Sequence, residues 1–359
     1  MVCDRMLDTY GPVAPALLLA QALKAKDYQV TLVSTKISSE VQGLLRSSSL
    51  DFVDLDVHLL TGNRPGFSWL ETWSREAFLK LNSRGFDPRS CLVINFSHTL
   101  AVPSAVWYAQ GPTTDAIRDM QAELPIAYQL LYKAVKPILE LGDRRLIRRM
   151  ASCSRLIVAN SKFCASLYEA RNLEVGGIIY PPLDCTTFIP TSTPRSDYVL
   201  TYMGKETDFT ALKNIGDAGM KVRIFGSKSP LKPRQVLAHP NIEFLGKVST
   251  HELVDLYSNA LFTLFTFTHE PFGYIPVESL ACGTPVLTYN SQGPSETVID
   301  GVTGWLANTR EEIQRLALRL WKSGYSSAMR TAARERALSF EREKIAGEWM
   351  QMIERLLGN

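Results

Sequence analysis

Short apolar runs alternate with helix-like segments along the first half of the chain. Residues 14–25 present a broad apolar helical surface, and residues 28–34 form a run rich in β-branched side chains. This alternation is typical of a parallel sheet covered by helices. It predicts a helix over 14–25 and a strand over 28–34. Further short buried strands are expected at residues 1–3, 91–96 and 156–159.

The same alternation restarts after a segment rich in proline and serine near the middle of the chain. Pro181 and Pro182, followed by residues 190–196, indicate an interdomain hinge. Residues 310–357 carry a helical pattern without strand signals. The elements expected in between are strands at 198–202, 222–225, 242–245, 261–267 and 285–289, and helices at 209–218 and 251–258. With 359 residues, two α/β domains fit the chain length.

One segment of the first half combines apolar and basic residues. Residues 124–150 predict a helical region interrupted at Pro137 and Gly142, and residues 133–149 carry a local charge of +4. Such a segment can lie on an anionic membrane surface. Its simpler interpretation is a solvated helix face that packs on the core.

Composition and charge exclude several classes of protein. The net charge of +3 is too small to require a nucleic-acid partner, and no apolar run is long enough to cross a membrane. The six cysteines form no C-x-x-C pair and have no histidine at ligand spacing, which argues against a zinc site and against a disulfide framework. The first residues do not form a secretory signal. Free thiols of this kind fit a reducing cytoplasm.

The most informative segment is H-E-P-F-G-Y-I-P-V-E at residues 269–278. It directly follows the predicted strand 261–267, and Gly273 and Pro276 indicate a turn that leads into a short helix. Glu270 is then expected on the loop and Glu278 on the second helical turn. A helix N-terminus favours an anion such as phosphate. Two carboxylates on either side of it suit a nucleotide sugar, which carries hydroxyls on both sides of its diphosphate.

Glu270 and Glu278 enclose seven residues, the E-x7-E pattern of retaining glycosyltransferases of family 4. Residues 241–260, 278–288 and 293–305 are also similar to blocks of that family, and residues 158–162 and 180–188 resemble its interdomain segment. The resemblance covers residues 155–310 well and the first half more loosely. The chain is therefore identified as a member of this family.

The resemblance implies the α/β fold called GT-B, in which two Rossmann-like domains face each other across a cleft. Residues 1–185 are then the acceptor-binding domain and residues 186–335 the nucleotide-sugar-binding domain. Residues 336–359 form a C-terminal helix that packs back on the first domain.

The resemblance also implies roles for the residues of the acidic segment. Glu270 contacts hydroxyls of the donor sugar and stabilises developing positive charge, and Glu278 binds the ribose hydroxyls. Three residues offer backbone N–H groups to the sugar and the phosphate, and Ile275 belongs to the same binding segment. These three residues are Phe272, Gly273 and Tyr274.

Three parts of the chain depart from the family pattern. The diphosphate-binding block is reduced to Gly204 and Lys205, and Lys213 or Lys228 is a candidate for its missing second cation. The Gly-Gly loop after the first strand retains only Gly11. Gln110 stands where many relatives have a histidine over the sugar. His98 is an alternative histidine for the acceptor side, although a satisfied structural role is also open.

The resemblance implies a retaining transfer of a hexose, mannose or glucose, from a GDP- or UDP-sugar to a glycan or lipid-linked acceptor. No metal and no further cofactor are expected, because Asp54 and Asp56 lie in an early strand-like run and are assigned a structural role. The expected place is the cytoplasm, with residues 133–149 on the inner face of a membrane. The alternatives are a nucleotide-sugar epimerase, a phosphorylase, or a non-catalytic sugar-nucleotide-binding partner subunit.

Overall fold

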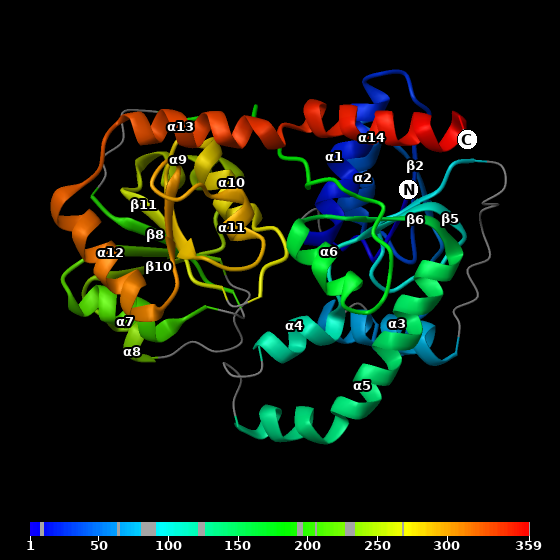
Figure 1. Cartoon of the computed structure of the whole chain (residues 1–359), viewed down its shortest axis with the longest axis horizontal. Helices are drawn as coiled ribbons and strands as arrows, with labels where there is room; N and C mark the ends of the chain where they lie inside the picture. Colours follow the sequence, from blue (N-terminus) through cyan, green and yellow to red (C-terminus); the bar gives the residue numbers. More distant parts are fainter. Residues whose placement is uncertain are drawn as a thin grey trace. The chain divides into compact units, whose positions relative to one another are not determined.

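The computed structural model describes residues 1–7, 11–62, 65–79, 91–120, 126–191, 197–204, 207–226, 234–267 and 269–358. The chain forms two compact units (Figure 1). The first unit comprises Met1–Arg118, Ile126–Pro182 and Arg342–Asn359, and the second comprises Leu183–Glu341 together with Asp119–Pro125. Each unit contains one parallel sheet covered by helices, as the alternating apolar pattern predicts.

The first unit is built on a seven-stranded sheet in the order β3-β2-β1-β4-β5-β6-β7. The strands are β1 (Val2–Cys3), β2 (Thr31–Ser34), β3 (Asp51–Asp54), β4 (Ile94–Asn95), β5 (Ser104–Ala109), β6 (Ser154–Ala159) and β7 (Gly177–Ile178). A short 3-10 turn, η1 (Gly11–Val13), precedes the first helix. The helices are α1 (Ala14–Lys24), α2 (Ser39–Ser47), α3 (Pro65–Phe78), α4 (Thr113–Met120), α5 (Ile126–Cys153), α6 (Lys162–Glu169) and α14 (Arg342–Gly358).

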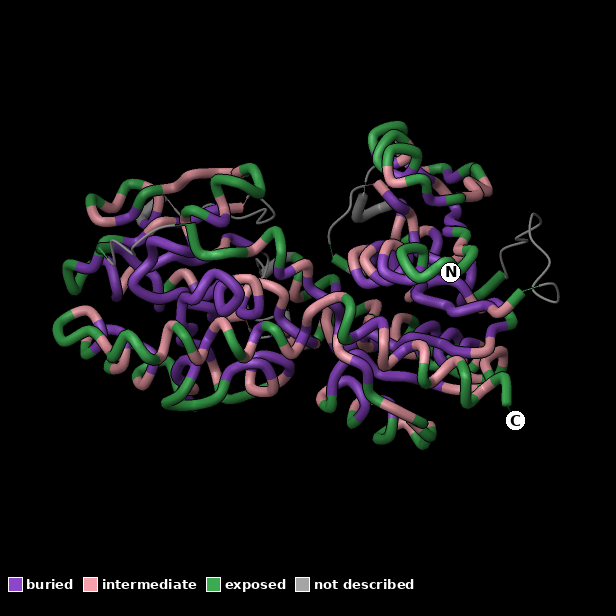
Figure 2. The backbone as a smooth tube through the Cα atoms, turned by 90° about the horizontal axis from the view of Figure 1, so that it is seen from above, coloured by how far each residue is buried: buried purple, intermediate pink, exposed green. Residues whose placement is uncertain are grey.

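The last helix, α14, supplies part of the core of the first unit. Trp349 is fully buried, and its ring lies 5.6 Å from the ring of Phe96 and 5.3 Å from that of Tyr108. Tyr108 in turn donates a hydrogen bond to the carbonyl of Ile179 at 2.8 Å. Figure 2 shows buried segments of the backbone running through the interior of this unit. The C-terminal helix is therefore a structural member of the N-terminal unit.

The second unit has a six-stranded sheet in the order β10-β9-β8-β11-β12-β13. Its strands are β8 (Val199–Tyr202), β9 (Val222–Phe225), β10 (Ile242–Gly246), β11 (Phe262–Phe265), β12 (Val286–Tyr289) and β13 (Gly304–Ala307). The 3-10 turn η3 (Leu338–Phe340) follows its last helix. The helices are α7 (Phe209–Asp217), α8 (Arg234–Leu237), α9 (Thr250–Asn259), α10 (Tyr274–Ala281), α11 (Pro294–Thr297), α12 (Arg310–Ser323) and α13 (Ala328–Ala337).

Arginines of α13 bind the C-terminal ends of two helices of the second unit. Arg330 donates to the carbonyl of Ser258 in α9 at 2.6 Å, and Arg334 donates to the carbonyl of Ala281, the last residue of α10, at 2.7 Å. Cations at a helix C-terminus satisfy open carbonyls and complement the helix dipole. Helix α13 therefore holds α10, whose other end carries the candidate site.

The predicted domain boundaries differ from the observed units by a few residues. The first unit ends at Pro182 rather than at residue 185, and Pro181 and Pro182 of the predicted hinge lie at this division. The last segment of the first unit begins at Arg342 rather than at residue 336, so that the end of α13 and η3 belong to the second unit. Residues 192–196 of the predicted hinge lie outside the described residues.

The predicted interruption of the helical segment at Pro137 and Gly142 is wrong. Helix α5 runs through both positions without a break. Pro137 lies on an exposed turn, where water can reach the backbone carbonyl that loses its partner. Gly142 is required by packing, because a Cβ there would lie 2.7 Å from the ring of Trp73 in α3. Asp54 accepts a hydrogen bond from the backbone N–H of Ile37 at 3.1 Å, in keeping with a structural role.

Candidate functional site

The candidate site of the second unit lies where the loop after β11 enters α10. Gly273 stands at the N-cap with φ of +94°, a left-handed conformation that side chains with a Cβ rarely adopt. Pro276 lies in the first turn of the helix, where no N–H is needed. Gly283, with φ of +71°, follows the other end of the helix. The helix therefore starts where the sequence predicts.

Glu270 uses its own side chain to bind the start of α10. One carboxylate oxygen accepts hydrogen bonds from the backbone N–H of Gly273 at 3.0 Å and from that of Phe272 at 3.4 Å. These are two of the amides that the family resemblance assigns to a ligand. A carboxylate at this place shows that the amides attract negative charge, as a helix N-terminus does.

A neighbouring turn fixes the backbone of Glu270. Gln292 accepts a hydrogen bond from the N–H of Glu270 at 2.6 Å, and Gly293 donates to the carbonyl of Glu270 at 3.0 Å. A Cβ on Gly293 would lie 2.3 Å from the carbonyl oxygen of Pro271, so that no side chain fits there. Gln292 itself has φ of +58°, a strained conformation for a residue other than glycine. The sequence analysis missed Gln292, although it directly precedes the block 293–305.

Glu278 lies on the second turn of α10 and is held by a tyrosine of α9. Tyr257 donates its hydroxyl to a carboxylate oxygen of Glu278 at 3.0 Å. Burial raises the pKa of Glu278 to about 7, and the hydrogen bond from Tyr257 offsets only part of that effect. Burial also raises the pKa of Tyr257 well above its usual value, so that the hydroxyl remains a donor. Sequence reasoning missed Tyr257, because the contact joins residues 21 positions apart.

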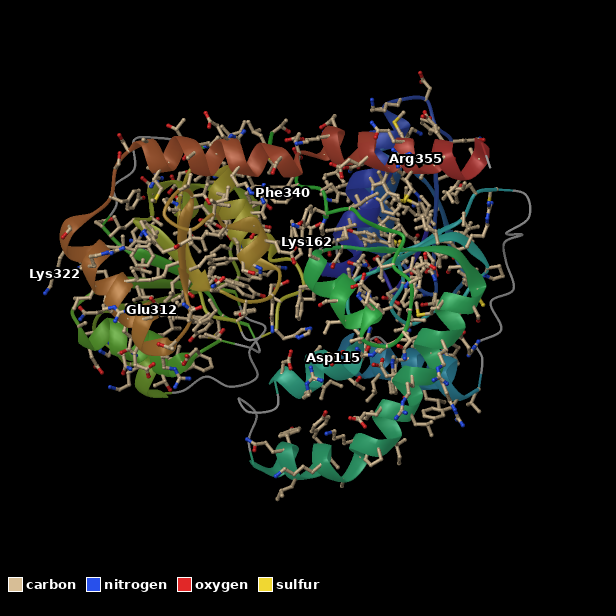
Figure 3. The ribbon with its side chains drawn as sticks, in the orientation of Figure 1. Asp115, Lys162, Glu312, Lys322, Phe340 and Arg355 are labelled. Carbon is tan, nitrogen blue, oxygen red and sulfur yellow. The ribbon has the colours of Figure 1, made fainter. Side chains whose placement is uncertain are left out.

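Aromatic side chains pack against the loop that leads into α10. Phe272 is buried, and its ring lies 5.4 Å from the ring of Tyr274 and 5.5 Å from that of Phe340, which Figure 3 labels. The guanidinium of Arg336 lies 4.9 Å from the ring centre of Phe340. Ile275 is partly buried and packs against an apolar cluster of this unit. The side chains of Phe272 and Ile275 are therefore structural, and what they can offer a ligand is backbone.

The end of β8 borders the same edge of the sheet. The side-chain hydroxyl of Thr207 accepts from the N–H of Gly204 at 2.8 Å, and a Cβ on Gly204 would lie 2.4 Å from the ring of Phe267. Lys205 and Lys228 lie outside the described residues. Lys213 pairs with Asp217 at 2.6 Å on the exposed face of α7, which leaves it a surface ion pair.

Gly11 begins the short turn η1 before α1 in the first unit. It has φ of +64°, and a Cβ there would have nothing within 4 Å. The need for glycine is therefore conformational and not steric. Residues 8–10 of the same loop lie outside the described residues.

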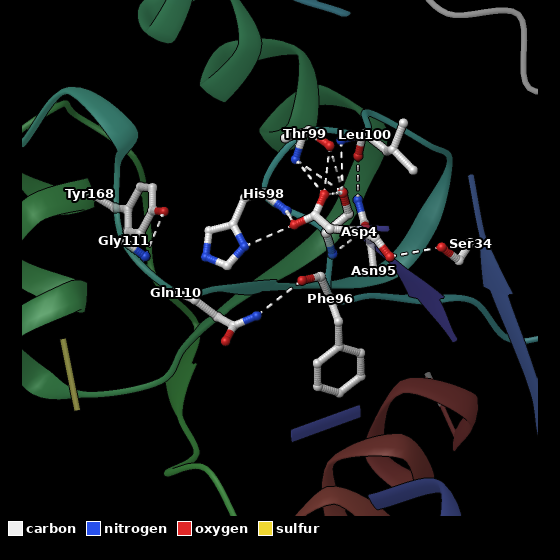
Figure 4. A network of polar contacts seen from close by, with 11 residues as sticks. Asp4, Ser34, Asn95, Phe96, His98, Thr99, Leu100, Gln110, Gly111 and Tyr168 are labelled. Atoms are coloured by element: carbon white, nitrogen blue, oxygen red, sulfur yellow. Dashed lines mark hydrogen bonds and ion pairs between the residues drawn. The ribbon is translucent and has the colours of Figure 1, made fainter. Parts of the chain in front are cut away.

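His98 and Gln110 lie together at the strand ends of the first unit (Figure 4). The ring Nδ1 of His98 is 3.1 Å from a carboxylate oxygen of Asp4, and Gln110 donates its amide to the carbonyl of Phe96 at 3.0 Å. Both side chains line a cavity of about 10 Å³, together with Asp143 and Tyr168. A cavity of this size holds about one water molecule. Asp4 is a further site residue that the sequence analysis missed.

Comparison with known proteins connects the second unit with a family. Residues 209–337 match the family model described as "Glycosyl transferases group 1". The chain is similar to a probable sucrose-phosphate synthase of Thermosipho melanesiensis, with 32% identity over 118 residues, which covers 32% of this chain and 27% of that protein. It is also similar to a GDP-mannose-dependent alpha-(1-6)-phosphatidylinositol dimannoside mannosyltransferase of Mycobacterium tuberculosis, with 32% identity over 148 residues, covering 40% and 38%. The matched segments thus span less than two fifths of these relatives.

Solved structures match nearly the whole chain. Anabaena Alr3699/HepE in complex with UDP aligns with a TM-score of 0.69 and 13% identity over 99% of both chains. Sucrose-phosphate synthase of Thermosynechococcus elongatus aligns with a TM-score of 0.68 and 16% identity over 99% of both chains. WaaG, a glycosyltransferase involved in lipopolysaccharide biosynthesis, aligns with a TM-score of 0.65 and 13% identity over 98% of this chain and 99% of that one.

These comparisons confirm the predicted fold, and the second unit matches the model of the predicted family. The two parallel-sheet, Rossmann-like units are those of the GT-B fold. The match to the group 1 glycosyltransferases covers residues 209–337, and this segment contains Glu270, Glu278 and all of α10.

Two kinds of feature are absent from the described residues. Among the helices described, none is long and apolar enough to cross a membrane. Within the same part of the chain, no three or more His, Cys, Asp or Glu side chains gather in a group that could hold a metal ion.

Proposed function

We propose that this protein is a retaining glycosyltransferase that moves a hexose from a nucleotide-diphosphate sugar to a glycan or lipid-linked acceptor. The observation that carries the proposal is the Glu270 carboxylate on the amides that begin α10, with Glu278 one turn further inside the same helix. This arrangement lies in the segment that matches the family model. An anion-binding helix start with an acidic residue on each side fits a diphosphate with hydroxyls at both ends.

The diphosphate or a sugar hydroxyl reaches the α10 amides by replacing the Glu270 carboxylate. The N–H groups of Phe272 and Gly273 then donate to the ligand, and the released carboxylate of Glu270 turns to the hydroxyls of the sugar. The backbone of Glu270 stays in place during this exchange, because Gln292 and Gly293 hold it independently of the side chain. In this proposal Glu270 is thus both a cap of α10 and a sugar-binding group.

Glu278 binds the ribose in this proposal. Its carboxyl accepts from Tyr257 through one oxygen, and two ribose hydroxyls are further donors of the same kind. Donors that converge on a buried carboxyl favour its ionised form. Nucleotide binding therefore lowers the pKa of Glu278 from about 7 and releases a proton near neutral pH.

The transfer itself proceeds on one face of the sugar. The acceptor oxygen attacks the anomeric carbon while the bond from that carbon to the diphosphate oxygen breaks, and the acceptor proton passes to the departing diphosphate. The carboxylate of Glu270 stabilises the positive charge that develops on the sugar ring, and the start of α10 stabilises the leaving anion. Lys205 is the cation that the sequence assigns to the diphosphate. No metal is included in this scheme.

Names of similar proteins favour mannose or glucose as the sugar. One relative is named GDP-mannose-dependent, and several others are named alpha-1,3/1,6-mannosyltransferases. One matched structure was determined with UDP-glucose. Both GDP-mannose and UDP-glucose are therefore the first donors to test.

Helix α5 is proposed as the surface that binds the inner face of a membrane from the cytoplasm. Tyr128, Leu130, Leu131 and Ile138 are each about three-fifths exposed on its N-terminal half. In Figure 1 this half of α5 extends away from the sheet of the first unit. The exposed basic residues on the helix, which complement anionic lipid, are Lys133, Lys136, Arg144, Arg145 and Arg148.

Flotation with anionic vesicles tests this surface. Lys133→Glu combined with Lys136→Glu should reduce binding at least about tenfold, since each basic residue contributes about 1 kcal/mol near such a membrane. Arg319→Glu combined with Lys322→Glu on exposed positions of α12 is the matched control for net charge. Equal loss in both double variants, or no loss in either, contradicts a role of α5.

The function is tested by a donor screen followed by product analysis. Purified full-length protein is incubated with radiolabelled GDP-mannose, UDP-glucose and related donors, with and without polyprenyl-linked or free glycan acceptors. We expect release of the nucleotide and transfer with retention at the anomeric carbon, read by NMR. Tight binding of a donor without any release indicates a non-catalytic partner subunit instead, and no binding of any nucleotide sugar overturns the proposal.

A further inference from the structure

One carboxylate of α4 contacts the loop that leads into α10. Asp119 is the last but one residue of α4, and the division into compact units places it in the second unit. Its carboxylate lies 2.9 Å from the ring Nδ1 of His269, although the two residues are 150 positions apart. His269 directly precedes Glu270 in the chain. The contact therefore reaches the residue next to the candidate catalytic carboxylate.

The ring of His269 is almost entirely buried. Its side chain is 6% exposed, whereas that of Asp119 is 22% exposed. A buried ring N–H without an acceptor loses its hydrogen bonds to water and gains nothing in return, which costs free energy. A carboxylate can only accept, so the hydrogen of this contact is on Nδ1 of the ring. The buried position of His269 is thus stabilised by Asp119.

The place of Asp119 is unfavourable for α4 itself. The C-terminal end of a helix carries a partial negative charge, so that a carboxylate in the last turn is repelled. The neighbouring Arg118 pairs with Asp115, three residues earlier in the same helix, at 2.7 Å. The contact with His269 therefore explains a carboxylate at this position better than the stability of α4 does.

Two supports meet at the peptide bond between His269 and Glu270. On one side, Gln292 accepts from the N–H of Glu270 at 2.6 Å, and Gly293 donates to the carbonyl of Glu270 at 3.0 Å. On the other side, Asp119 binds the ring of His269. Without Asp119 the ring turns toward water, and the peptide bond that it shares with Glu270 moves with it. The direction of the Glu270 carboxylate then changes.

We propose that Asp119 is a positioning residue of the loop 269–273 and that it acts on Glu270 through His269. The pair keeps the Glu270 carboxylate at the start of α10 before the donor binds and directed at the sugar afterwards. This inference rests on the proposed glycosyl transfer. It adds a residue that lies outside the segment 209–337 matched by the family model.

The second unit offers a matched control for this pair. Asp217, the last residue of α7, lies 3.1 Å from the ring Nε2 of His239, whose side chain is 11% exposed. This is again a carboxylate at the end of a helix that binds a histidine with little exposure. His239 belongs to the loop before β10 and not to the loop 269–273. Asp217→Ala therefore removes a similar contact without touching the candidate site.

Steady-state kinetics of full-length variants measure the effect on transfer. Asp119→Ala should lower kcat about tenfold, as expected for the loss of one hydrogen bond, while the calorimetric Kd for the donor changes less than about threefold. Asp119→Asn keeps an oxygen that accepts from Nδ1 and should restore kcat to within about threefold of the wild type. Asp217→Ala should have no effect. A wild-type kcat in Asp119→Ala, or an equal loss in Asp217→Ala, overturns the inference.

A double-mutant cycle tests whether Asp119 acts through Glu270. In Glu270→Gln the carboxylate is already lost, so that adding Asp119→Ala should lower kcat less than about twofold further. A contribution of Asp119 to the fold that is independent of Glu270 would instead multiply the two losses, because separate effects add as free energies. Multiplied losses would overturn the inference.

Ring ¹⁵N shifts test the contact without any turnover. The His269 ring should carry its proton on Nδ1 in the wild-type protein and should lose this preference in Asp119→Ala. The backbone amides of Glu270 and Gly273 should shift in the same variant. Wild-type protein that transfers no sugar would refute the proposed function. Active wild-type protein with the His269 ring protonated at Nε2 alone would refute this inference only.

Discussion

The two sheets reverse their strand order at equivalent places but hold different chemistry there. In the second unit the reversal lies between β8 and β11, and the loop after β11 leads into the amides at the start of α10, which Glu270 binds. In the first unit it lies between β1 and β4, where Asp4 and His98 form a pair. One place holds backbone N–H groups that suit an anion, and the other holds a hydrogen-bonded carboxylate–histidine pair. Similar topology therefore presents two different sets of polar groups.

The largest expected effect is a loss of kcat when Glu270 of the second unit is changed. Glu270→Gln keeps an oxygen that can cap α10 but removes the charge that stabilises the developing cation. We expect kcat to fall about 10²–10³-fold, the usual effect of deleting one stabilising group, with little change in the free energy of unfolding. Steady-state kinetics with a calorimetric Kd for the donor provide the measurement. An unchanged kcat in Glu270→Gln would contradict a catalytic role of the carboxylate in the second unit.

A pH-dependent effect is expected from Glu278. Its pKa is about 7 in the folded chain against 4.5 for an ordinary glutamate, so the folded state binds the proton more tightly. Stability should therefore fall as pH rises from about 4.5 to about 7, by up to about 3 kcal/mol at 1.4 kcal/mol per pKa unit. Urea unfolding at several pH values measures this slope. Glu278→Gln should remove that part of the slope, and an identical slope in the variant contradicts the assignment.

A second change at Glu278 tests whether the nucleotide and the acceptor bind to different residues. Glu278→Ala should weaken nucleotide binding about tenfold, because a hydrogen bond from each ribose hydroxyl is lost. The acceptor KM should not follow this change. Calorimetry with GDP and UDP, in parallel with acceptor kinetics, distinguishes the two. A Kd equal to that of the wild-type protein would exclude Glu278 from the ribose site.

A smaller effect is expected from the turn that fixes Glu270. Gly293→Ala forces a Cβ against the carbonyl of Pro271 and should cost about 1–3 kcal/mol of unfolding free energy as well as activity. Gly43→Ala in α2 is the control, since a Cβ there meets nothing within 4 Å and should stabilise the helix slightly. Denaturant unfolding of both variants gives the comparison. Equal stability of the two variants would show that the turn does not restrain the loop.

The sequence predicted the second unit more completely than the first. Most residues of its strands are apolar, and β9 (Val222–Phe225) has the predicted bounds. In the first unit β5 (Ser104–Ala109) was missed, because its mixed run of small and aromatic residues lacks a clear period, although nearly all of it is buried. The predicted strand at 91–96 shortens to Ile94–Asn95, since the loops around it are fixed by side-chain hydrogen bonds.

The residues of the candidate site also fall into a group that the sequence predicted and a group that it did not. Glu270, Gly273 and Glu278 could be placed from local spacing, because they belong to one loop and one helix. Gln292, Tyr257 and Asp4 could not, because each acts on a residue far away in the sequence; Asp4 and His98 are 94 residues apart. Contacts of this kind depend on strand order, which apolar patterns do not specify.

The central claim is that the amides at the start of α10 exchange the Glu270 carboxylate for the nucleotide sugar. Backbone amide NMR of the full-length protein during titration with GDP-mannose or UDP-glucose measures this exchange directly. The account predicts saturable shifts of the Phe272 and Gly273 amides that follow the calorimetric Kd, and similar shifts in Glu270→Gln. Saturable binding that leaves both amides unmoved would contradict it.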